Sequence, residues 1–351
     1  MSKGPKPHVT IGIPCYNAER TIVETLESVL SQDYPAFEIV VCDNASTDRT
    51  PQIVKSYENK GVKYIHNSIV RSAEANWNHL LDHIATEYLC LYHADDLYDP
   101  SMVSRQMDFL LNEQVSAVFT MSSIINENNA ILKPRKKTES ALPSSLKGER
   151  TFGFEVIFNA LLIHSNFIRT PTLMTTKKTL EAVGKFRYEL FKSSSDLDLW
   201  LRMSRYKAIG IIDETLHRYR VSSTQGSSLI YNSRLEPQDY FKVIDHYLRE
   251  QSVKDMVSER ALASYQSHEG EELITCSTNL LLQGEPQRAV QFLTIALNRK
   301  NVWYAKRFLG RLVKYAMGFG LLISIYLGFG KALAGAIDSA YRKERKIWSK
   351  T

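Results

Sequence analysis

The chain has 351 residues, and its 44% hydrophobic content excludes a largely disordered protein and suits one large domain plus an appendage. Its net charge of +6 is unevenly distributed. Residues 299–351 carry 12 Lys and Arg against two acidic residues, about +10, which leaves the preceding part of the chain at about −4.

The cysteines and the first residues indicate the compartment. The four cysteines, Cys15, Cys42, Cys90 and Cys276, lie far apart without a CxxC pair, and three of them fall in apolar runs. This pattern argues against a structural zinc site and favours a reducing environment. The polar first residues run into an apolar segment without the pattern of a signal peptide, so we expect a cytoplasmic protein.

The first third of the chain predicts alternating strands and helices. Short β-branched runs at 9–15, 37–43, 62–66 and 88–93 predict four strands, and amphipathic segments that begin at Thr21, Arg49 and Ala73 predict the helices between them. This alternation is typical of a mostly parallel sheet covered by helices. Because ligands of such sheets bind beyond the carboxyl ends of the strands, the polar residues that follow each strand are the candidate site.

The middle of the chain is less regular. Residues 126–150 are polar and include the basic cluster KPRKK, which predicts a surface loop that we interpret as a candidate lid. A helix is predicted from Phe152 to Leu162, and another opens near Asp196. After Glu236 the pattern is helical throughout, with one predicted helix-turn-helix hairpin at 271–298.

Four motifs occur in a characteristic order: VTIGIPCYNAERTIVETLESVLSQDYPAFEIVVCDNASTDRT at 9–50, ANWNHLL, YLCLYHADDLYDP and SSDLDLWLRM. Together they resemble the family 2 inverting glycosyltransferases with the GT-A fold, over roughly residues 8–230. The resemblance implies an α/β fold, a three-layer α/β/α sandwich with a C-terminal helical extension. We expect a catalytic domain at 1–235, a helical extension at 236–300 and a basic, apolar tail at 301–351.

The resemblance also implies the reaction. The enzyme would move a sugar from a nucleotide-sugar donor to the hydroxyl of a saccharide or lipid-linked acceptor, with inversion and a divalent cation, in polysaccharide or glycolipid assembly. Two alternatives remain. A sugar-nucleotide-binding scaffold without activity is suggested because His93 and Ser195 stand where acids are common. The second alternative is a nucleotidyltransferase. It is less favoured, because such an enzyme usually has a glycine-rich, basic loop after its first strand, and the segment PCYNAE has neither a glycine nor a basic residue. A dinucleotide dehydrogenase is not supported, since no GxGxxG follows a strand.

Residues at two predicted strand ends suit a nucleotide. They supply an apolar wall and hydrogen-bond acceptors for base and ribose, and they are Pro14, Tyr16, Asn17, Glu19 and Asp43. By resemblance, Asp43 would accept a hydrogen bond from the base. The alternative is that Asn17 and Asp43 cap the helices behind them, the role that we predict for Asp48.

Other residues are candidate donor contacts. Arg71, Arg218 and Arg220 are plausible phosphate ligands, because guanidinium groups bind phosphate oxygens bidentately. Asn76 and Asn78 resemble a helix of the family that lines the donor site, with structural packing as an equal alternative.

A diphosphate leaving group develops negative charge, so we expect Mn²⁺ or Mg²⁺ held by carboxylates. The family pattern is usually Asp-x-Asp, and HADD has His93 at the first position. The resemblance therefore implies Asp95 as the ligand that contacts both metal and donor, with Asp96 beside it. The alternative is that Asp96 and Asp99 cap the helix after Pro100.

Inverting transfer needs a base that takes the proton of the acceptor hydroxyl. Asp196 matches the carboxylate of the acidic motif of the family, in which Glu commonly stands at the position of Ser195. Asp198 remains a rival, although it falls within the predicted helix.

The tail pattern predicts a membrane partner. Residues 316–330 are apolar for only 15 residues, short of the ~20 that a spanning helix needs. They lie between the basic residues Arg307, Arg311 and Lys314 and the basic residues Arg342, Lys343, Arg345 and Lys346. This arrangement favours peripheral contact with the inner face of an anionic cell membrane. It does not favour a nucleic-acid partner. The alternative is an ordinary core helix packed against the catalytic domain.

Overall fold

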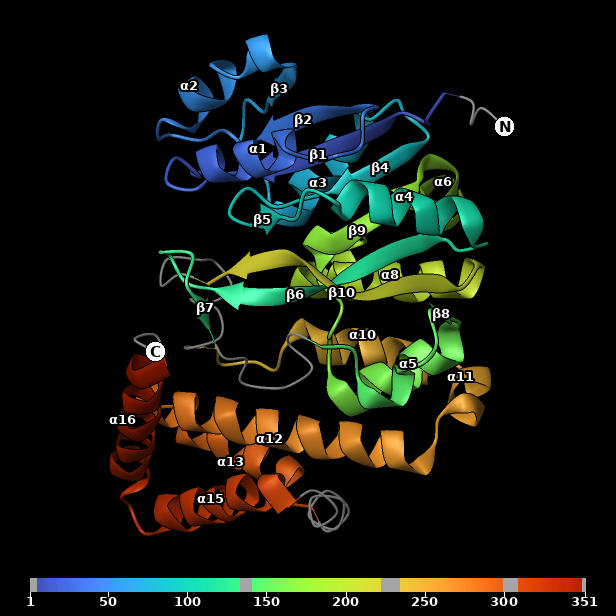
Figure 1. The fold of residues 1–351 in the computed structure, drawn as a ribbon. Coiled ribbons are helices and arrows are strands. Elements are labelled where there is room, and N and C mark those ends of the chain that lie inside the picture. Colours follow the sequence, from blue (N-terminus) through green and yellow to red (C-terminus); the bar gives the residue numbers. More distant parts are fainter. Residues whose placement is uncertain (1–4, 133–140, 222–233, 299–308, 349–351) are drawn as a thin grey trace. The chain divides into compact units, whose positions relative to one another are not determined.

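The computed structural model describes residues 5–132, 141–221, 234–298 and 309–348 (Figure 1). The basic cluster KPRKK at 133–137 therefore lies outside the described residues. The chain divides into two compact units, one formed by residues 1–158 and 166–220 and the other by 159–165 and 221–351.

The first unit is built on a mixed sheet with the order β3-β2-β1-β4-β9-β6-β10-β5, in which β7 pairs with β6 and β8 with β10. Its strands are β1 (Val9–Cys15), β2 (Phe37–Asp43), β3 (Val62–His66), β4 (Tyr88–Leu91), β5 (Leu97–Tyr98), β6 (Ala117–Ile125), β7 (Ile131–Leu132), β8 (Thr151–Phe152), β9 (Leu173–Thr176) and β10 (Ile209–Arg220). The first three strands have the predicted bounds, whereas the fourth ends two residues early. Strands β1 to β4 are parallel, and β9 runs antiparallel to both β4 and β6.

Helices cover both faces of this sheet, as Figure 1 shows. They are α1 (Ile22–Leu30), α2 (Thr50–Lys55), α3 (Ala73–Asp82), α4 (Met102–Asn112), α6 (Lys177–Val183), α7 (Tyr188–Phe191) and α8 (Ser195–Tyr206), and α5 (Phe154–His164) continues into the second unit. Apolar residues of α1, α2 and α4 pack with alternate residues of the strands, such as Ile11 and Ile13, in one core cluster. The expected three-layer α/β/α sandwich is confirmed.

Close packing on the opposite face fixes the strand that carries the first motif. A Cβ at Gly12 of β1 would lie 2.9 Å from Leu80 of α3, a distance that only glycine permits without movement. On the same side of the sheet, the ring of Trp200 of α8 meets Phe119 of β6 edge to face, with centroids 4.8 Å apart. Helices α3 and α8 are thereby held against the central strands.

The described residues of the predicted surface loop at 126–150 form local hydrogen-bonded structure. Strand β7 pairs with the end of β6 through a turn in which Asn126 and Ala130 bond to each other. A single turn of 3-10 helix (Ser144–Leu146) precedes β8. The role of a lid stays a prediction.

The second unit is helical, as predicted. It contains α10 (Asp239–Leu248), α11 (Gln251–Met256), α12 (Glu259–Gln283), α13 (Pro286–Ala296), α15 (Leu309–Tyr326) and α16 (Gly330–Trp348). The predicted hairpin is α12 and α13, and its first helix begins earlier than expected, at Glu259. Gly284 ends α12 in the left-handed conformation (φ 83°), and Pro286 starts α13, the usual placement of these two residues.

The apolar run of the tail forms most of α15 and a turn through Gly328. One face of α15, including Tyr315 and Leu321, is buried with α12, α13 and α16. No helix among the described residues is long and apolar enough to cross a bilayer.

Candidate active site

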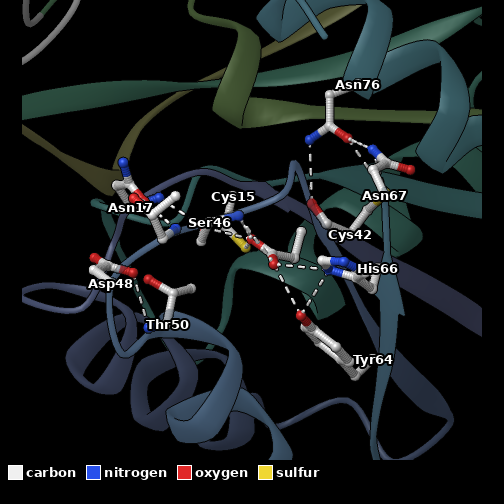
Figure 2. A network of polar contacts seen from close by, with 12 residues as sticks. Cys15, Asn17, Cys42, Ser46, Asp48, Thr50, Tyr64, His66, Asn67 and Asn76 are labelled. Carbon is white, nitrogen blue, oxygen red and sulfur yellow. Dashed lines mark hydrogen bonds and ion pairs between the residues drawn. The ribbon is translucent and has the colours of Figure 1, made fainter. Parts of the chain in front are cut away.

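The two loops that follow β1 and β2 are hydrogen-bonded to each other, and we call residues 16–21 and 44–49 the strand-end loops (Figure 2). The amide of Asn17, a residue with φ of 48°, donates to Ser46 Oγ at 2.8 Å, and Thr47 N donates to Asn17 Oδ1 at 2.9 Å. Glu19 Oε2 accepts from Arg49 N at 3.1 Å. Asn17 and Glu19 are both predicted to contact the sugar-nucleotide donor, and each uses a side-chain oxygen to accept a hydrogen bond from the opposite loop.

Capping explains Asp48 but not Asn17. Asp48 Oδ1 accepts from Thr50 N at 2.9 Å, the first amide of α2, so Asp48 satisfies one helix-end donor although Arg49 holds the N-cap position. Its second oxygen accepts from Glu19 N at 3.1 Å and ties the loops together again. Helix α1 begins after Thr21, and Asn17 bonds to the neighbouring loop instead of capping that helix.

Asp43, at the end of β2, is fully buried and has protein partners on both carboxylate oxygens. Tyr64 Oη donates to Oδ2 at 2.8 Å, and the hydroxyl and amide of Ser46 donate to Oδ1. His66 Nδ1 lies 3.4 Å from Oδ2. Burial, together with the Asp43 carboxylate, raises the pKa of Tyr64, so this phenol remains a donor. A nucleobase that bonds to Asp43 must share or displace these donors.

Three other residues predicted to bind the sugar-nucleotide donor differ in how exposed they are to solvent. Pro14 is buried within β1, and the side chain that follows the strand, Tyr16, is 49% exposed. Arg71 is exposed, and its backbone is fixed because its N–H and carbonyl both pair with the side chain of Asn44, at 2.9 and 2.8 Å. Tyr16 and Arg71 are accordingly available for contact with a ligand.

The two asparagines of α3 have packing roles. Asn78 pairs in both directions with the backbone of Phe186, at 2.8 and 3.0 Å. Asn76 is buried, donates to the carbonyl of Cys42 at 3.1 Å and accepts from Asn67 at 2.6 Å. The structural alternative left open for these residues accounts for their observed contacts.

The acidic turn, His93–Asp96, follows β4. One ligand atom from each of His93, Asp95 and Asp96 lies within 4.8 Å of the others. His93 Nε2 is buried without a hydrogen-bond partner in the described part of the chain, and Asp96 Oδ2 is buried 3.0 Å from His217 Nε2. A buried imidazole nitrogen without a partner is rare, and here it lies beside two carboxylates. The donor set therefore fits a divalent cation.

Asp96 is the most buried member of the acidic turn. Burial raises its pKa to about 6, although His93 and a 2.8 Å hydrogen bond from Arg220 N act in the opposite direction. Asp96 does not cap the helix after Pro100. Asp99 does not cap it either, because Asp99 accepts from Ser101 N at 3.0 Å, before α4 begins at Met102.

His217 of β10 lies directly behind Asp96, and the sequence analysis did not identify it. Its Nε2 is 3.0 Å from Asp96 Oδ2, and its Nδ1 is 2.8 Å from Ser122 Oγ on β6. Burial lowers the pKa of His217 to about 3, so the ring is neutral. His217 and Ser122 face each other in the register of β6 and β10, a pairing without a local sequence signal.

Arg220, also on β10, binds the acidic turn through hydrogen bonds of its side chain. Its Nε donates to the carbonyl of Asp95, one terminal nitrogen to Glu24 and the other to Asn129, each at 2.7 Å. All three guanidinium nitrogens are engaged within the protein, so Arg220 does not fit the predicted phosphate contact. Arg218 is exposed.

The two candidate bases at the start of α8 lie in different environments. Asp196 accepts from Thr170 Oγ1 at 2.8 Å and from Leu197 N at 2.6 Å, and burial raises its pKa to about 6. Asp198 is fully buried and ion-paired with Arg202 at 2.8 Å, and Arg202 also donates to the carbonyl of Lys185. Asp198 is therefore a packing residue, and Asp196 is the better candidate for the base.

Comparison with known proteins agrees with this geometry. Residues 10–180 match the family model described as glycosyl transferase family 2. The chain belongs to this family. This family 2 glycosyltransferase is 29% identical over 227 residues to the putative glycosyltransferase EpsE of Bacillus subtilis, covering 64% of this chain and 76% of the relative.

Two further similarities concern a bacterial enzyme and a solved structure. The family 2 glycosyltransferase is 30% identical over 137 residues to the Escherichia coli enzyme WfgD, named a UDP-Glc:α-D-GlcNAc-diphosphoundecaprenol β-1,3-glucosyltransferase, covering 38% of this chain and 54% of the relative. The crystal structure of S. aureus TarS 1–349 in complex with UDP-GlcNAc has a TM-score of 0.57 at 18% identity, with 92% of each chain covered. That likeness establishes a shared fold.

Proposed function

We propose that this glycosyltransferase transfers a sugar from a nucleoside diphosphate donor to an acceptor hydroxyl with inversion. The observation that carries the proposal is the acidic turn, in which the ligand atoms of His93, Asp95 and Asp96 converge and the buried His93 Nε2 has no partner in the described residues. A structural turn would satisfy such a nitrogen within the protein, whereas a site for a diphosphate and its counterion would leave it for the ligand.

Asp95 and Asp96, with His93 beside them, would hold the divalent cation. When bound, Mn²⁺ or Mg²⁺ neutralises charge that develops on a diphosphate leaving group. Mn²⁺ suits the mixed nitrogen and oxygen donors, whereas Mg²⁺ favours oxygen alone. Arg220 and His217 hold the carbonyl of Asp95 and the carboxylate of Asp96 from behind.

Asp196 would act as the general base. Its carboxylate takes the proton of the acceptor hydroxyl while that oxygen bonds to the anomeric carbon, and the bond from this carbon to the nucleoside diphosphate breaks. Thr170 and the amide of Leu197 hold the two oxygens in place. A pKa of about 6 keeps most of the carboxylate ionised at neutral pH and still basic enough to accept a proton.

Donor recognition is divided between contact residues and supporting residues. Tyr16 and Arg71, which are exposed beside the ends of β1 and β2, would contact the donor directly. Asn17 and Glu19 would shape that surface through the bonds between the strand-end loops. Asp43 would contact the base by sharing the donors that surround it.

The acceptor is proposed to be a saccharide or a lipid-linked saccharide in polysaccharide or glycolipid assembly. The E. coli relative is named for an undecaprenol-diphosphate-linked acceptor, which supports this class. Such lipid-linked acceptors are membrane-bound, so we propose that the chain works in peripheral contact with the inner face of an anionic membrane.

A donor screen tests the proposal. The full chain is incubated with UDP-, GDP- and dTDP-sugars and Mn²⁺ or Mg²⁺, and release of the nucleoside diphosphate is measured. Release that is lost in Asp196→Asn is the expected result. Calorimetric binding of a sugar nucleotide without release from any donor, even with saccharide acceptors added, would favour the non-catalytic scaffold. Pyrophosphate formed from a nucleoside triphosphate and a sugar phosphate would favour the nucleotidyltransferase.

A further inference from the structure

Helix α15 presents an apolar face that the described residues of the protein leave uncovered. The exposed residues Val313, Ala316, Phe319, Ile323 and Tyr326 recur at steps of three and four, which places them on one side of the helix, and the exposed Leu327 follows its last residue. We call this set the α15 outer stripe. Val313 and Tyr326 are each 76% exposed, and no charged residue interrupts residues 315–330.

The opposite face of α15 is fixed within the second unit. Tyr315 is buried and donates to the carbonyl of Ser267 at 3.1 Å, and Leu321 is fully buried. A Cβ at Gly318 would lie 2.9 Å from Ile274 of α12, so the two helices are in close contact. Because protein covers the inner face, only the outer stripe of this helix can meet another apolar phase.

We propose that the α15 outer stripe is the surface by which the protein lies on an anionic bilayer. The inference rests on the membrane contact proposed above and names the helix face that makes it. An amphipathic helix in this setting lies parallel to the membrane plane, with its apolar side among the acyl chains. Tyr326 is of a type that is enriched at the interface of a bilayer, and Phe319 is of a type common on the apolar side of interfacial helices.

Charge selects the lipid surface over a second copy of the chain. Residues 299–351 carry about +10, and Lys314 and Lys331 directly flank the apolar run. Symmetric pairing through the stripe would bring two such tails together, and the like charges would repel. Phosphatidylglycerol headgroups carry the complementary charge and attract nearby basic residues.

Sedimentation with lipid vesicles tests the surface. The full chain is mixed at low salt with vesicles of phosphatidylcholine alone or with phosphatidylglycerol added, and the bound fraction is measured. We expect binding to the anionic vesicles, weakened by high salt. The variant Ile323→Ser/Tyr326→Ser should bind at least ~10-fold more weakly, because two apolar contacts are lost.

A matched variant controls for the general loss of exposed apolar residues. Leu111 of α4 and Ile295 of α13 are 51% and 54% exposed, similar to Ile323 at 58%, and neither lies on α15. Leu111→Ser/Ile295→Ser should bind vesicles as the unchanged chain does. Circular dichroism and melting temperature establish that both variants fold, which we expect because the changed side chains are exposed.

Three results would overturn the inference. In the first, the unchanged chain does not pellet with anionic vesicles, and in the second, the two double variants bind them equally. In the third, the unchanged chain does not bind vesicles but forms a dimer, and Ile323→Ser/Tyr326→Ser dissociates that dimer. This result would assign the stripe to a second copy of the chain. Nucleoside diphosphate release is measured without lipid, so failure of the membrane inference and failure of the proposed transfer reaction are distinguished.

Discussion

The strand-end loops and the acidic turn lie at the carboxyl ends of neighbouring strands, yet their polar groups are used differently. In the strand-end loops, Asn17, Glu19 and Asp48 bond to the opposite loop, and Asp43 is enclosed by Ser46 and Tyr64. In the acidic turn, His93 Nε2 is buried without a partner in the described residues, beside the carboxylates of Asp95 and Asp96. Polar density alone therefore does not mark chemistry. Buried polar atoms that the fold leaves unsatisfied are the stronger sign.

The largest expected effect concerns the base. Asp196→Asn should lower turnover by ~10²- to 10⁴-fold, because the amide cannot take the proton of the acceptor, while donor affinity stays unchanged. Steady-state kinetics and calorimetric donor titration measure the two quantities. Asp198→Asn is the control and should chiefly lower the melting temperature, since Arg202 would lose its buried partner. Near-normal turnover in Asp196→Asn would exclude Asp196 as the base.

The acidic turn is tested by removing its half-buried carboxylate. Asp95→Ala should abolish the metal dependence of nucleoside diphosphate binding, a loss greater than the ~10- to 100-fold typical of changes behind a metal ligand. Calorimetry with and without Mn²⁺ measures this dependence. Asp99→Ala, a change in the turn that precedes α4, should keep this metal dependence. Equal metal dependence in Asp95→Ala and the unchanged chain would contradict the site.

His217 sharpens the comparison, because it supports the acidic turn without belonging to it. His217→Phe removes the imidazole behind Asp96 and should weaken Mn²⁺ affinity by ~10- to 100-fold. Ser122→Ala leaves the imidazole in place and should have a smaller effect. Direct titration with Mn²⁺ and nucleoside diphosphate provides the readout. A folded His217→Phe variant with unchanged affinity would reduce His217 to a packing residue.

The pH dependence tests the raised pKa of Asp196. The base acts only when ionised, so kcat/KM should fall about tenfold per pH unit below about pH 6. The carboxyl of Asp96 also has a pKa of about 6, so the residual activity of Asp196→Asn is the control. If protonation of Asp196 causes the decline, the residual activity of Asp196→Asn should not decline below about pH 6. A decline that persists in Asp196→Asn would assign the titration elsewhere.

Burial of the ionised Asp196 carboxylate has a consequence for stability as well. Because its folded pKa lies above the ordinary value, the folded state binds protons more tightly, and the contribution of this group falls as pH rises from about 4 through about 6. As pH rises over this interval, the melting temperature of Asp196→Asn should therefore increase relative to that of the unchanged chain.

The smallest expected effect belongs to the strand-end loops. Tyr64→Phe removes a donor from Asp43 and should lower the free energy of unfolding by about 1 kcal/mol, because a buried acceptor loses a partner. Chemical denaturation measures the change. Tyr57→Phe is a matched control, since the Tyr57 hydroxyl bonds to the exposed Glu27 and water can replace it. Equal losses in both variants would show that burial of Asp43 adds nothing.

Local patterns in the sequence determined the secondary structure of its first third up to β4, and the family. The β-branched runs gave the bounds of β1, β2 and β3, since side-chain alternation and flanking polar residues are properties of short segments. The starts of α1, α2 and α3 also followed from local signals. Sequence likewise placed the acidic turn after β4 and Asp196 at the start of α8.

Only the tertiary structure decided which of these polar residues are satisfied. Asn78 pairs with Phe186 from 108 positions away, and His217 meets Ser122 through the register of two strands. The choice of Asp196 over Asp198 depends on Arg202, whose carbonyl partners come from the end of α6 and the residues after it. The uncovered face of α15 follows from its packing against α12. Burial and pairing are set by distant segments, so a local pattern names candidates, and the contacts between segments decide their roles.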